Sequence, residues 1–566
     1  MRRIFYVSSL SLGLMTSTLA CGDAGPSADA GNAADAGFTA DAGRPDLGTP
    51  DTGAPDTGTP DSGAPDSGTP DSGAPDTGPT SVLTQTEQDF FRTTTPLAAE
   101  PPADSTNRYA ASSTAGAAAA IIGQKWFFDR RFSGPVGAAG QGQISPAPTD
   151  PPAAVVAAVG PKGTTGLVAC ASCHSFENGA FGDDRKSPNH VSLGTGVHPR
   201  NAPPVVNSAY YEVTNWAGRF AAQWELPLPV SENPRIMNGS RMYLAQQIWK
   251  NYKDEYKATF QEYEHGTDGG DALMDAIKLK IAAFNAAQNP VIAGDELSGA
   301  TISRGKPKAN AAAPDGLWET LSAGERAFVN RVATNFGKAL AAYQRKLVRR
   351  ETPFDAWAAG GFVGAEIPLT AQRGAKVFIK AGCDKCHKGT MFTDSLFHNT
   401  GLTQLNPLDQ PPTEGVGATP ADGSDAGRFA DGDALAKANG GGGATPGISV
   451  DTKWSDDRVR GAALIAQFNA ITPMPDSARG SFRTPSLRGV KDTAPYMHAG
   501  QLKTLAEVVD FYARGGDASG FAGTKDPLIV PVTLTAEEKT DLVSFLEQLS
   551  ATDALPATLI MDTSGQ

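Results

Sequence analysis

The sequence is poor in cysteine, in long apolar runs and in strand-like alternation. It has five cysteines among 566 residues, and the apolar run at residues 4–15 is too short to span a bilayer as a stable anchor. Alternation of apolar and polar residues, which would predict half-buried strands, is scarce, whereas helical periodicity recurs along the body of the chain. A mainly β fold is therefore excluded, and the positions of the few cysteines carry most of the information.

Four of the five cysteines belong to two motifs of the type Cys-X-X-Cys-His. The motif residues are Cys170, Cys173 and His174, and then Cys383, Cys386 and His387. In such a motif the two thiols bond to the vinyl groups of a haem, and the adjacent histidine ligates the iron from one face. A thioredoxin-like motif or a four-thiolate zinc site also uses Cys-X-X-Cys pairs, but neither needs a histidine directly after both pairs. The motifs therefore predict two covalently attached haem c groups.

The amino-terminal residues predict export. Arg2 and Arg3 precede the apolar run, and small residues lead up to Cys21, so residues 1–20 are predicted to be a signal peptide. Cys21 stands where a lipoprotein would be lipidated, although the residues before it depart from the usual lipobox. Covalent haem attachment also needs an oxidising, exported compartment. We expect a periplasmic protein or an outer-membrane-tethered lipoprotein with a lipid anchor at Cys21.

Residues 21–80 are predicted to be a disordered tether. Their five-residue repeats of Pro, Asp, Thr or Ser, Gly and Ala offer almost nothing apolar to bury, so folding could not offset the loss of chain entropy. The tether has eleven aspartates and one arginine, a net charge of −10, and the leader has +2 from Arg2 and Arg3, so −5 of the total net charge of −13 lies on residues 81–566. The acidity thus lies mainly in the tether, and we expect no nucleic-acid partner.

The remaining body predicts a mainly α fold. Residues 81–566 are long enough for two domains, and capping boxes that begin at Ser322 and Thr535 each open an apolar helical pattern. Two intervals of low complexity, residues 135–165 and about 406–479, interrupt the body. We interpret both intervals as surface insertions.

A series of short blocks along the body supports a more specific interpretation. The blocks are residues 126–134, 170–174, 200–203 and 216–219 in the amino-terminal half, and 383–387, 392–394, 397–401, 482–487 and 493–498 in the carboxy-terminal half. In this order the chain resembles the bacterial diheme cytochrome c peroxidase and MauG superfamily over about residues 85 to 550. The resemblance implies two cytochrome c-like haem domains, a peroxidatic one at 81–350 and an electron-transfer one at 351–566.

The resemblance also implies residues that lie between the two haems. On the family pattern Trp216 is a bridging indole, and Asn201 with the backbone carbonyls of Thr493 and Pro495 would hold a calcium ion. Oxygen donors suit this hard cation. The alternative for Trp216 is a simple core aromatic, which is the commoner fate of a lone tryptophan.

The first haem is where peroxide is expected to react, because a peroxidatic iron needs a vacant axial position. Members of the family place a removable histidine directly after a Ser-X-Gly segment. Here residues 192–194 form that segment and Thr195 follows it, which predicts an iron that is open at rest. His198 and His190 are the alternatives that could still reach the iron.

Cleavage of the peroxide bond also needs a group that moves a proton to the leaving oxygen. The family usually supplies a glutamate shortly after an Asn-Pro pair, but this chain has Ile236 after Asn233 and Pro234. Glu232 is the candidate that could replace the missing acid from the other side. This departure argues against efficient turnover as a peroxidase.

The second haem has its own candidate ligand. A capping box at Thr504 opens a short helix whose apolar face includes Tyr512. At this position cytochrome c peroxidases resembling this chain typically have a methionine, and MauG-like enzymes have a tyrosine. A hard phenolate stabilises ferric iron, so we predict that Tyr512 is the distal ligand. The alternatives are a tyrosine that only packs on the helix face, and ligation by Met391, Met474 or Met497.

Three functions of different classes remain open at this point. The first is reduction of hydrogen peroxide to water, with electrons that arrive through the second haem from a small c-type cytochrome or cupredoxin. The second is MauG-like, peroxide-dependent oxidation of tryptophan or tyrosine side chains on a partner protein. The third is a non-catalytic electron carrier with two haems. A peroxide turnover assay with an electron donor separates the third from the other two.

Protein that is matured in an export-competent host should carry two covalently bound haems, because each motif supplies two thiols and a histidine. Mass spectrometry of the intact protein measures this. Replacement of both Cys383 and Cys386 by alanine should remove the mass of one haem and leave the other. A haem-free mass or a single haem in the wild type would contradict the prediction, and bound zinc would favour the four-thiolate site.

Overall fold

The computed structural model describes most of the chain after the predicted tether. The described residues are 81–137, 153–176, 192–196, 198, 200–260, 270–307, 316–403, 427, 448–449, 451–469 and 479–565. All of them belong to one of the two units into which the chain divides, Pro75–Gln566. The predicted signal peptide, the tether, Cys21, His190, Met474 and most of the 406–479 interval lie outside the described residues.

The described part of the chain is mainly helical, which confirms the predicted fold class. The helices are α1 (Gln85–Arg92), α2 (Thr114–Phe128), α3 (Ala153–Ala158), α4 (Cys170–Cys173), α5 (Pro227–Glu232), α6 (Arg241–Asn251), α7 (Lys253–Thr259), α8 (Asp271–Ala286), α9 (Leu317–Thr320), α10 (Ala323–Gln344), α11 (Pro353–Ala359), α12 (Leu369–Lys380), α14 (Arg458–Asn469), α15 (Leu505–Ala513), α16 (Ala536–Glu547) and α17 (Ala557–Ile560). Strands β1 (Phe397–His398) and β2 (Phe482–Arg483) pair antiparallel, with Phe397 opposite Arg483. None of the described helices has both the length and the apolarity that a membrane crossing requires.

The predicted capping boxes are present at the starts of three helices. At α10 the Ser322 hydroxyl accepts from the Glu325 amide and the Glu325 carboxylate accepts from the Ser322 amide. Thr504 and Thr535 begin equivalent boxes at α15 and α16. Each box satisfies amide groups that have no partner within the helix.

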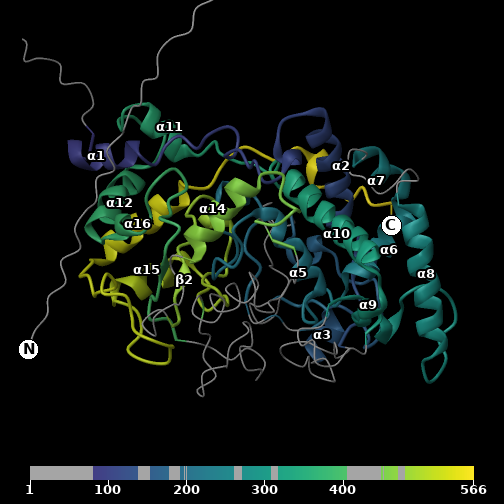
Figure 1. The fold of residues 1–566 in the computed structure, drawn as a ribbon. Coiled ribbons are helices and arrows are strands. Elements are labelled where there is room, and N and C mark those ends of the chain that lie inside the picture. Colours follow the sequence, from purple (N-terminus) through teal and green to yellow (C-terminus); the bar gives the residue numbers. More distant parts are fainter. Residues whose placement is uncertain are drawn as a thin grey trace, which may run out of the picture. The chain divides into compact units, whose positions relative to one another are not determined.

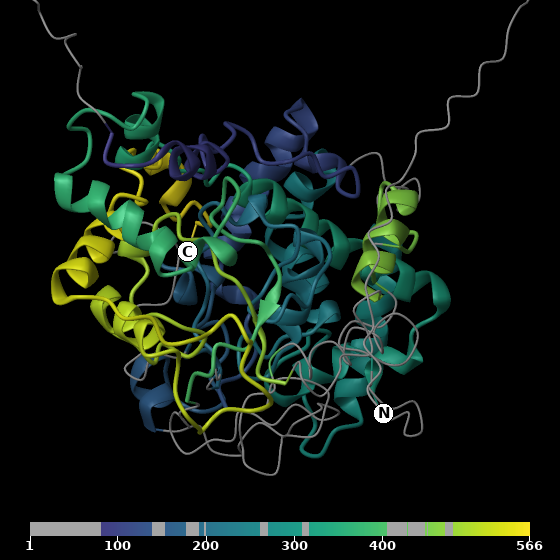
Figure 2. The same ribbon diagram turned by 90° about the vertical axis from the view of Figure 1, so that its left-hand side faces the viewer.

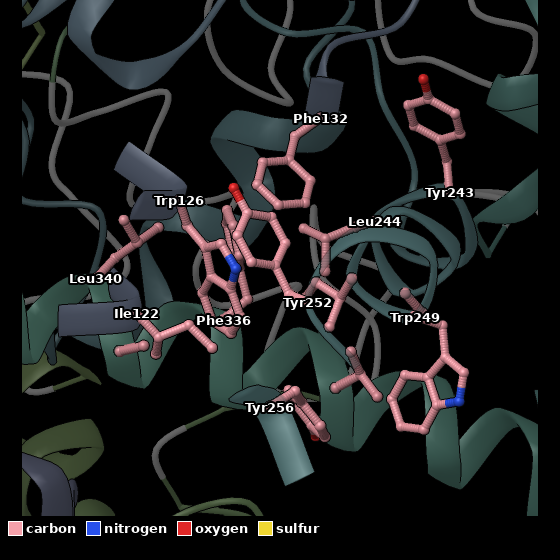
Figure 3. Packing of buried hydrophobic residues seen from close by; sticks show 14 of the residues in the cluster. Ile122, Trp126, Phe132, Tyr243, Leu244, Trp249, Tyr252, Tyr256, Phe336 and Leu340 are labelled. Carbon is pink, nitrogen blue, oxygen red and sulfur yellow. The ribbon is translucent and has the colours of Figure 1, made fainter. Parts of the chain in front are cut away.

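The first hydrophobic core lies where α2 packs along α10 (Figure 1). The two backbones approach so closely that a side chain at Gly123 would meet the Ala339 carbonyl at 2.1 Å. Figure 3 shows part of this cluster, with Trp126 next to Phe132 and Phe336. The Trp126 ring stacks on the Phe336 ring at a centroid distance of 5.4 Å. This aromatic core supports the segment that carries the first cysteine motif.

The second hydrophobic core lies between α12 and α16 and has Phe91 of α1 at its centre. Phe91 has no solvent exposure and packs against several other phenylalanines, namely Phe90, Phe354, Phe362, Phe378 and Phe545. Both ribbon views place the purple segment that carries α1 next to green and yellow segments from the carboxy-terminal half (Figure 1; Figure 2). The amino-terminal helix therefore completes the core of the carboxy-terminal half.

The carboxy-terminal tail, in turn, packs on the core of the amino-terminal half. After α16 it reaches the first core, where the Leu559 carbonyl accepts a 2.5 Å hydrogen bond from Tyr343 and the Thr558 carbonyl accepts one from Gln124. The predicted boundary between residues 350 and 351 thus separates the two cores except at the two ends of the described chain. The division into two haem domains stays a prediction.

Residues 451–469 of the 406–479 interval are anchored to the first half of the chain. Trp454 is buried in a cluster with Trp224, and Asp456 binds the buried ammonium of Lys338 at 2.6 Å. Asp456 also accepts a hydrogen bond from the Arg108 side chain at 3.0 Å. Residues 451–469 are therefore docked on α10.

Substitution of Phe91 by alanine should lower the free energy of unfolding by about 3–5 kcal/mol, because it removes a buried ring from the centre of the second core. The control is Leu369→Ala in α12, where the side chain is 56% exposed. Urea unfolding of both variants, followed by helical circular dichroism, measures the difference. Equal stabilities of the two variants would show that α1 is not part of this core.

Candidate functional site

The second Cys-X-X-Cys-His motif lies beside a large cavity. It follows α12 directly, and Gly382, with a φ of 74°, allows the tight turn that begins the motif. Cys383, Cys386 and His387 all line the cavity, which has about 260 Å³ of space that the centre of a water molecule can reach. Most of the remaining lining is apolar and comes from α12, α15, α16 and residues 482–498. The sequence thus places both thiols and the histidine at the edge of one space.

His387 is oriented as a haem ligand would need to be. Its Nδ1 lies 2.9 Å from the Phe392 carbonyl oxygen, so this nitrogen donates a proton to the carbonyl and Nε2 is the atom that can take iron. Burial lowers the pKa of His387, against the opposing effect of the Phe392 carbonyl, which favours the neutral ring that metal binding requires. The residues at this cavity therefore fit a covalently attached haem.

Tyr512 lines the same cavity as the motif, on the inner face of α15. Burial raises the pKa of its phenol, and the nearby thiols of Cys383 and Cys386 raise it further. Met391 and Met497 also line the cavity. The structure thus brings Tyr512 and two of the three alternative methionines to the second motif, and ligation by Tyr512 stays a prediction.

Trp216 lies at the wall of this cavity, together with Asn201. Its indole Nε1 donates a 2.8 Å hydrogen bond to the Asn201 backbone carbonyl. The centroid of its ring lies 6.5 Å from that of His498, which in turn stacks on Phe482 at 3.8 Å. Trp216 therefore joins a block of the amino-terminal half to the cavity of the second motif, and its role as a bridge between two haems stays a prediction.

The three residues predicted to bind calcium lie together. The Asn201 amide donates to the His498 carbonyl at 2.8 Å, and the Asn201 side-chain amide lies 3.5 Å from the Pro495 carbonyl oxygen. The Asn201 side-chain oxygen is buried without a hydrogen-bond partner. Thr493 and Pro495 line the same cavity as Asn201. A buried side-chain oxygen without a donor, on a residue whose nitrogen atoms contact backbone carbonyls, fits a cation that accepts oxygen ligands.

The first motif is held against the first core. Cys170–Cys173 forms the short helix α4, and the His174 amide donates to the Cys170 carbonyl at 2.8 Å. Burial raises the pKa of the Cys170 thiol to about 12. The His174 ring lies 6.4 Å from the Phe127 ring, centroid to centroid. The described residues thus present this motif as a rigid turn on an aromatic surface.

Thr195 is engaged in hydrogen bonds and is not available as a ligand in this structure. It is fully buried, its hydroxyl donates to the Pro234 carbonyl at 2.9 Å, and its amide donates to the Ile236 carbonyl at 2.9 Å. His198 Nδ1 lies 2.9 Å from the Arg200 carbonyl oxygen. The loop at 192–196 is therefore fastened to the segment after Asn233, where the family's acid is expected.

Glu232 is engaged in a buried ion pair. Its two carboxylate oxygens accept from Nε and Nη2 of Arg241 at 2.9 and 3.0 Å, and both side chains are almost inaccessible to solvent. The ammonium of Lys306 donates to the Glu232 backbone carbonyl at 2.7 Å. Proton transfer by Glu232 would require this pair to open, so the geometry favours a structural role. Its catalytic role stays a prediction without support from these contacts.

Sequence reasoning missed two polar side chains at the second cavity, His398 and Arg483. His398 lies between Asp526 at 2.6 Å and Asp394 at 3.1 Å. The Cys386 thiol, and then the two carboxylates, raise the pKa of His398 to about 10. Donor atoms of Cys386, Asp394 and His398 lie within 4.8 Å of one another, but the haem would occupy the sulfur of Cys386. Asp526 is 128 residues from His398, so no local sequence pattern could have indicated the pair.

Comparison with known proteins points to one family. The family model described as di-haem cytochrome c peroxidase matches residues 160–291. Cytochrome-c peroxidase IdrP1 of Denitromonas iodatirespirans is 29% identical over 402 residues, which cover 69% of this chain and 78% of that protein. Methylamine utilization protein MauG of Methylorubrum extorquens is 26% identical over 396 residues, which cover 69% of this chain and 74% of that protein.

Among solved structures, the diheme peroxidase BthA from Burkholderia thailandensis E264 aligns with 77% of this chain and 86% of its own, at 18% sequence identity and a TM-score of 0.45. The order of blocks in the sequence and the matches to these relatives agree. The family model, IdrP1 and MauG thus support the resemblance that the order of blocks indicated, to the bacterial diheme cytochrome c peroxidase and MauG superfamily.

Proposed function

We propose that this protein is a diheme c-type peroxidase that reduces hydrogen peroxide to water with electrons from a small c-type cytochrome or cupredoxin. The family implies two haem c groups, and both cysteine motifs suit them. The observation that supports the proposal is a difference between the two sites in their candidate axial ligands. The Thr195 hydroxyl, at the family's switch position, is bonded to the Pro234 carbonyl, whereas Tyr512 and two methionines line the second cavity.

This asymmetry suits a division of labour between the two sites. A haem at the first motif would supply an iron with a free position for peroxide, and two electrons and two protons then convert one peroxide into two waters. His174 would hold that haem from one side, on the surface formed by Phe127. The second site, with a candidate ligand on each side, would receive electrons from the donor and pass them on.

Trp216 would carry electrons between the two sites. It lines the second cavity, and its indole is fixed by the hydrogen bond to the Asn201 carbonyl. We also propose that Asn201, Thr493 and Pro495 hold a calcium ion, because the buried Asn201 side-chain oxygen has no hydrogen-bond partner and the Asn201 side-chain nitrogen lies 3.5 Å from the Pro495 carbonyl oxygen. Such an ion would keep the Trp216 loop attached to the segment at 493–498.

Export is part of the proposal, because covalent haem attachment needs an oxidising compartment. The predicted lipid anchor at Cys21 and the two domains divided near residue 350 belong to the proposal as well. A lipidated Cys21 would tether the body to a membrane through residues 21–80.

Tyr512 favours a second candidate function, MauG-like oxidation of tryptophan or tyrosine side chains on a partner protein. A phenolate ligand favours the more oxidised states of iron, which suits a haem that stores oxidising equivalents and not one that only relays electrons. The position of Tyr512 on the same cavity wall as Cys383 and Cys386 supports this candidate. The two candidates share the first haem and Trp216 and differ in the use of the second haem.

The first haem of the resting, diferric protein should be five-coordinate and high-spin, because Thr195 provides no strong ligand. Electron paramagnetic resonance measures this, and donor-supported peroxide turnover should begin without prior reduction. The variant His198→Ala should leave both results unchanged. A low-spin signal that disappears in His198→Ala would show that His198 is the ligand, and the absence of turnover would favour the non-catalytic electron carrier.

Substitution of Tyr512 separates the two enzymatic functions. If Tyr512 ligates the second iron, Tyr512→Met should raise the reduction potential of that haem, because a thioether favours ferrous iron. Tyr512→Phe should open the site to added imidazole, which optical spectroscopy detects. Met391→Leu and Met497→Leu are the matched controls and should leave the spectrum unchanged. A methionine-to-iron band that survives in Tyr512→Phe and is lost in either control would favour the peroxidase function over the MauG-like one.

A further inference from the structure

The second cavity has an uneven charge among its described lining residues. Two arginines, Arg483 and Arg488, belong to the lining, and it includes no aspartate, glutamate or lysine. Both arginines are almost completely buried, with 5% and 6% of their surface exposed. A buried guanidinium needs an anion or several acceptors nearby, because removal of its charge from water costs several kcal/mol.

Arg488 has such partners within the protein. Its Nη1 and Nη2 bind the Asp355 carboxylate at 2.7 and 3.0 Å, and Nη2 also donates to the Thr94 carbonyl at 2.9 Å. Its Nε donates to the Thr390 carbonyl at 2.5 Å. Arg488 thus ties the segments around residues 94, 355 and 390 together, and its charge is neutralised by Asp355.

Arg483 has no such anion among the residues that the structure describes. Its Nε donates to the Asn215 carbonyl at 3.3 Å, and its Nη1 donates to the Thr484 carbonyl at 3.2 Å. The guanidinium stacks on the Tyr211 ring at 3.9 Å. The described residues offer its Nη2 no acceptor, and no carboxylate among them lies within 4.0 Å of it. Arg483 is therefore a fixed, buried cation on the wall of the cavity, and its charge is not balanced.

We propose that Arg483 binds a propionate of the second haem, an inference that rests on the proposed binding of haem at Cys383 and Cys386. A haem has two propionate groups, and a carboxylate is the anion that the planar fork of arginine binds best. The cavity that would take the haem contains no carboxylate of its own among its described lining residues. The haem would thus bring the anion that the buried Arg483 lacks.

The contacts of Arg483 also place this propionate. The Arg483 amide donates to the Trp216 carbonyl at 2.8 Å, and its side chain holds the carbonyl of the preceding residue, Asn215. The bound propionate would therefore lie beside Trp216, the residue proposed to carry electrons from one site to the other. Arg483 would position this edge of the haem and would favour the ferrous state by its positive charge.

The experiment uses the full-length holoprotein and three variants. Arg483→Gln removes the charge, Arg483→Lys keeps the charge without the fork, and Arg373→Gln is the control. Arg373 lies on α12 with 40% of its side chain exposed, binds Asp541 and Glu537, and does not line the cavity. Mass spectrometry first establishes the haem content of each protein, and an optical redox titration then gives the potential of the second haem.

Arg483→Gln should keep both haems and shift the second haem toward the ferric state by at least tenfold, which equals about 59 mV for one electron. Arg483→Lys keeps the positive charge, so the potential of the second haem should return most of the way to the wild-type value. In Arg373→Gln the ratio of ferric to ferrous second haem should stay within twofold of the wild type, because water and salt screen the charge of Arg373. A ratio of ferric to ferrous second haem in Arg483→Gln that stays within twofold of the wild type would overturn the proposal.

A second measurement decides the question if Arg483→Gln does not accumulate. Resonance Raman spectra should show a changed propionate bending band in Arg483→Lys, because lysine cannot form the paired bonds of arginine. An unchanged band would overturn the proposal. A wild-type protein without haem at the second motif would instead contradict the proposed function itself, so the two failures are distinguishable.

Discussion

The hydrogen bond between His387 and the Phe392 carbonyl is the constraint on which the second site depends. It selects the ring nitrogen that faces the cavity, and it works only because the Phe392 backbone is held in place. The Phe392 ring is fully buried in the second core and packs on Phe354 at 5.4 Å. Its backbone has a φ of 49°, a left-handed conformation that the surrounding packing has to hold. The aromatic core thus sets the direction of the proposed iron ligand.

Local sequence signals predicted much of the fold. The capping boxes at Ser322, Thr504 and Thr535 and the helical periodicity behind them depend on residues a few positions apart, and the helices begin where these signals place them. The packing of Phe91 on the second core and the docking of Trp454 near Trp224 were not predicted. These contacts join segments that are hundreds of residues apart, and no local pattern encodes them.

The same division holds at the candidate site. The cysteine motifs and the inward face of Tyr512 could be predicted because each lies within one short segment. The pair of Glu232 and Arg241 could not, since a sequence shows two charges but not their burial beside each other. The different roles of Arg483 and Arg488, five positions apart, likewise depend on whether a distant Asp355 is within reach. The role of a buried charged side chain therefore depends on which partners lie within its reach, and not on the residue type.

The family blocks of the two halves meet along one seam at the cavity wall. The Asn201 amide bonds to the His498 carbonyl, the Arg483 amide bonds to the Trp216 carbonyl, and all four residues line the second cavity. The chain departs from the family pattern at Thr195 and at Ile236, which are not among the described lining residues of the second cavity, and the Thr195 amide donates to the Ile236 carbonyl. The departures thus lie in the loop expected to face peroxide, and the contacts that join the two halves at the second cavity use other residues. The proposed function therefore relates these departures to the reaction at the first haem, and the contacts of the seam to the proposed electron path through Trp216.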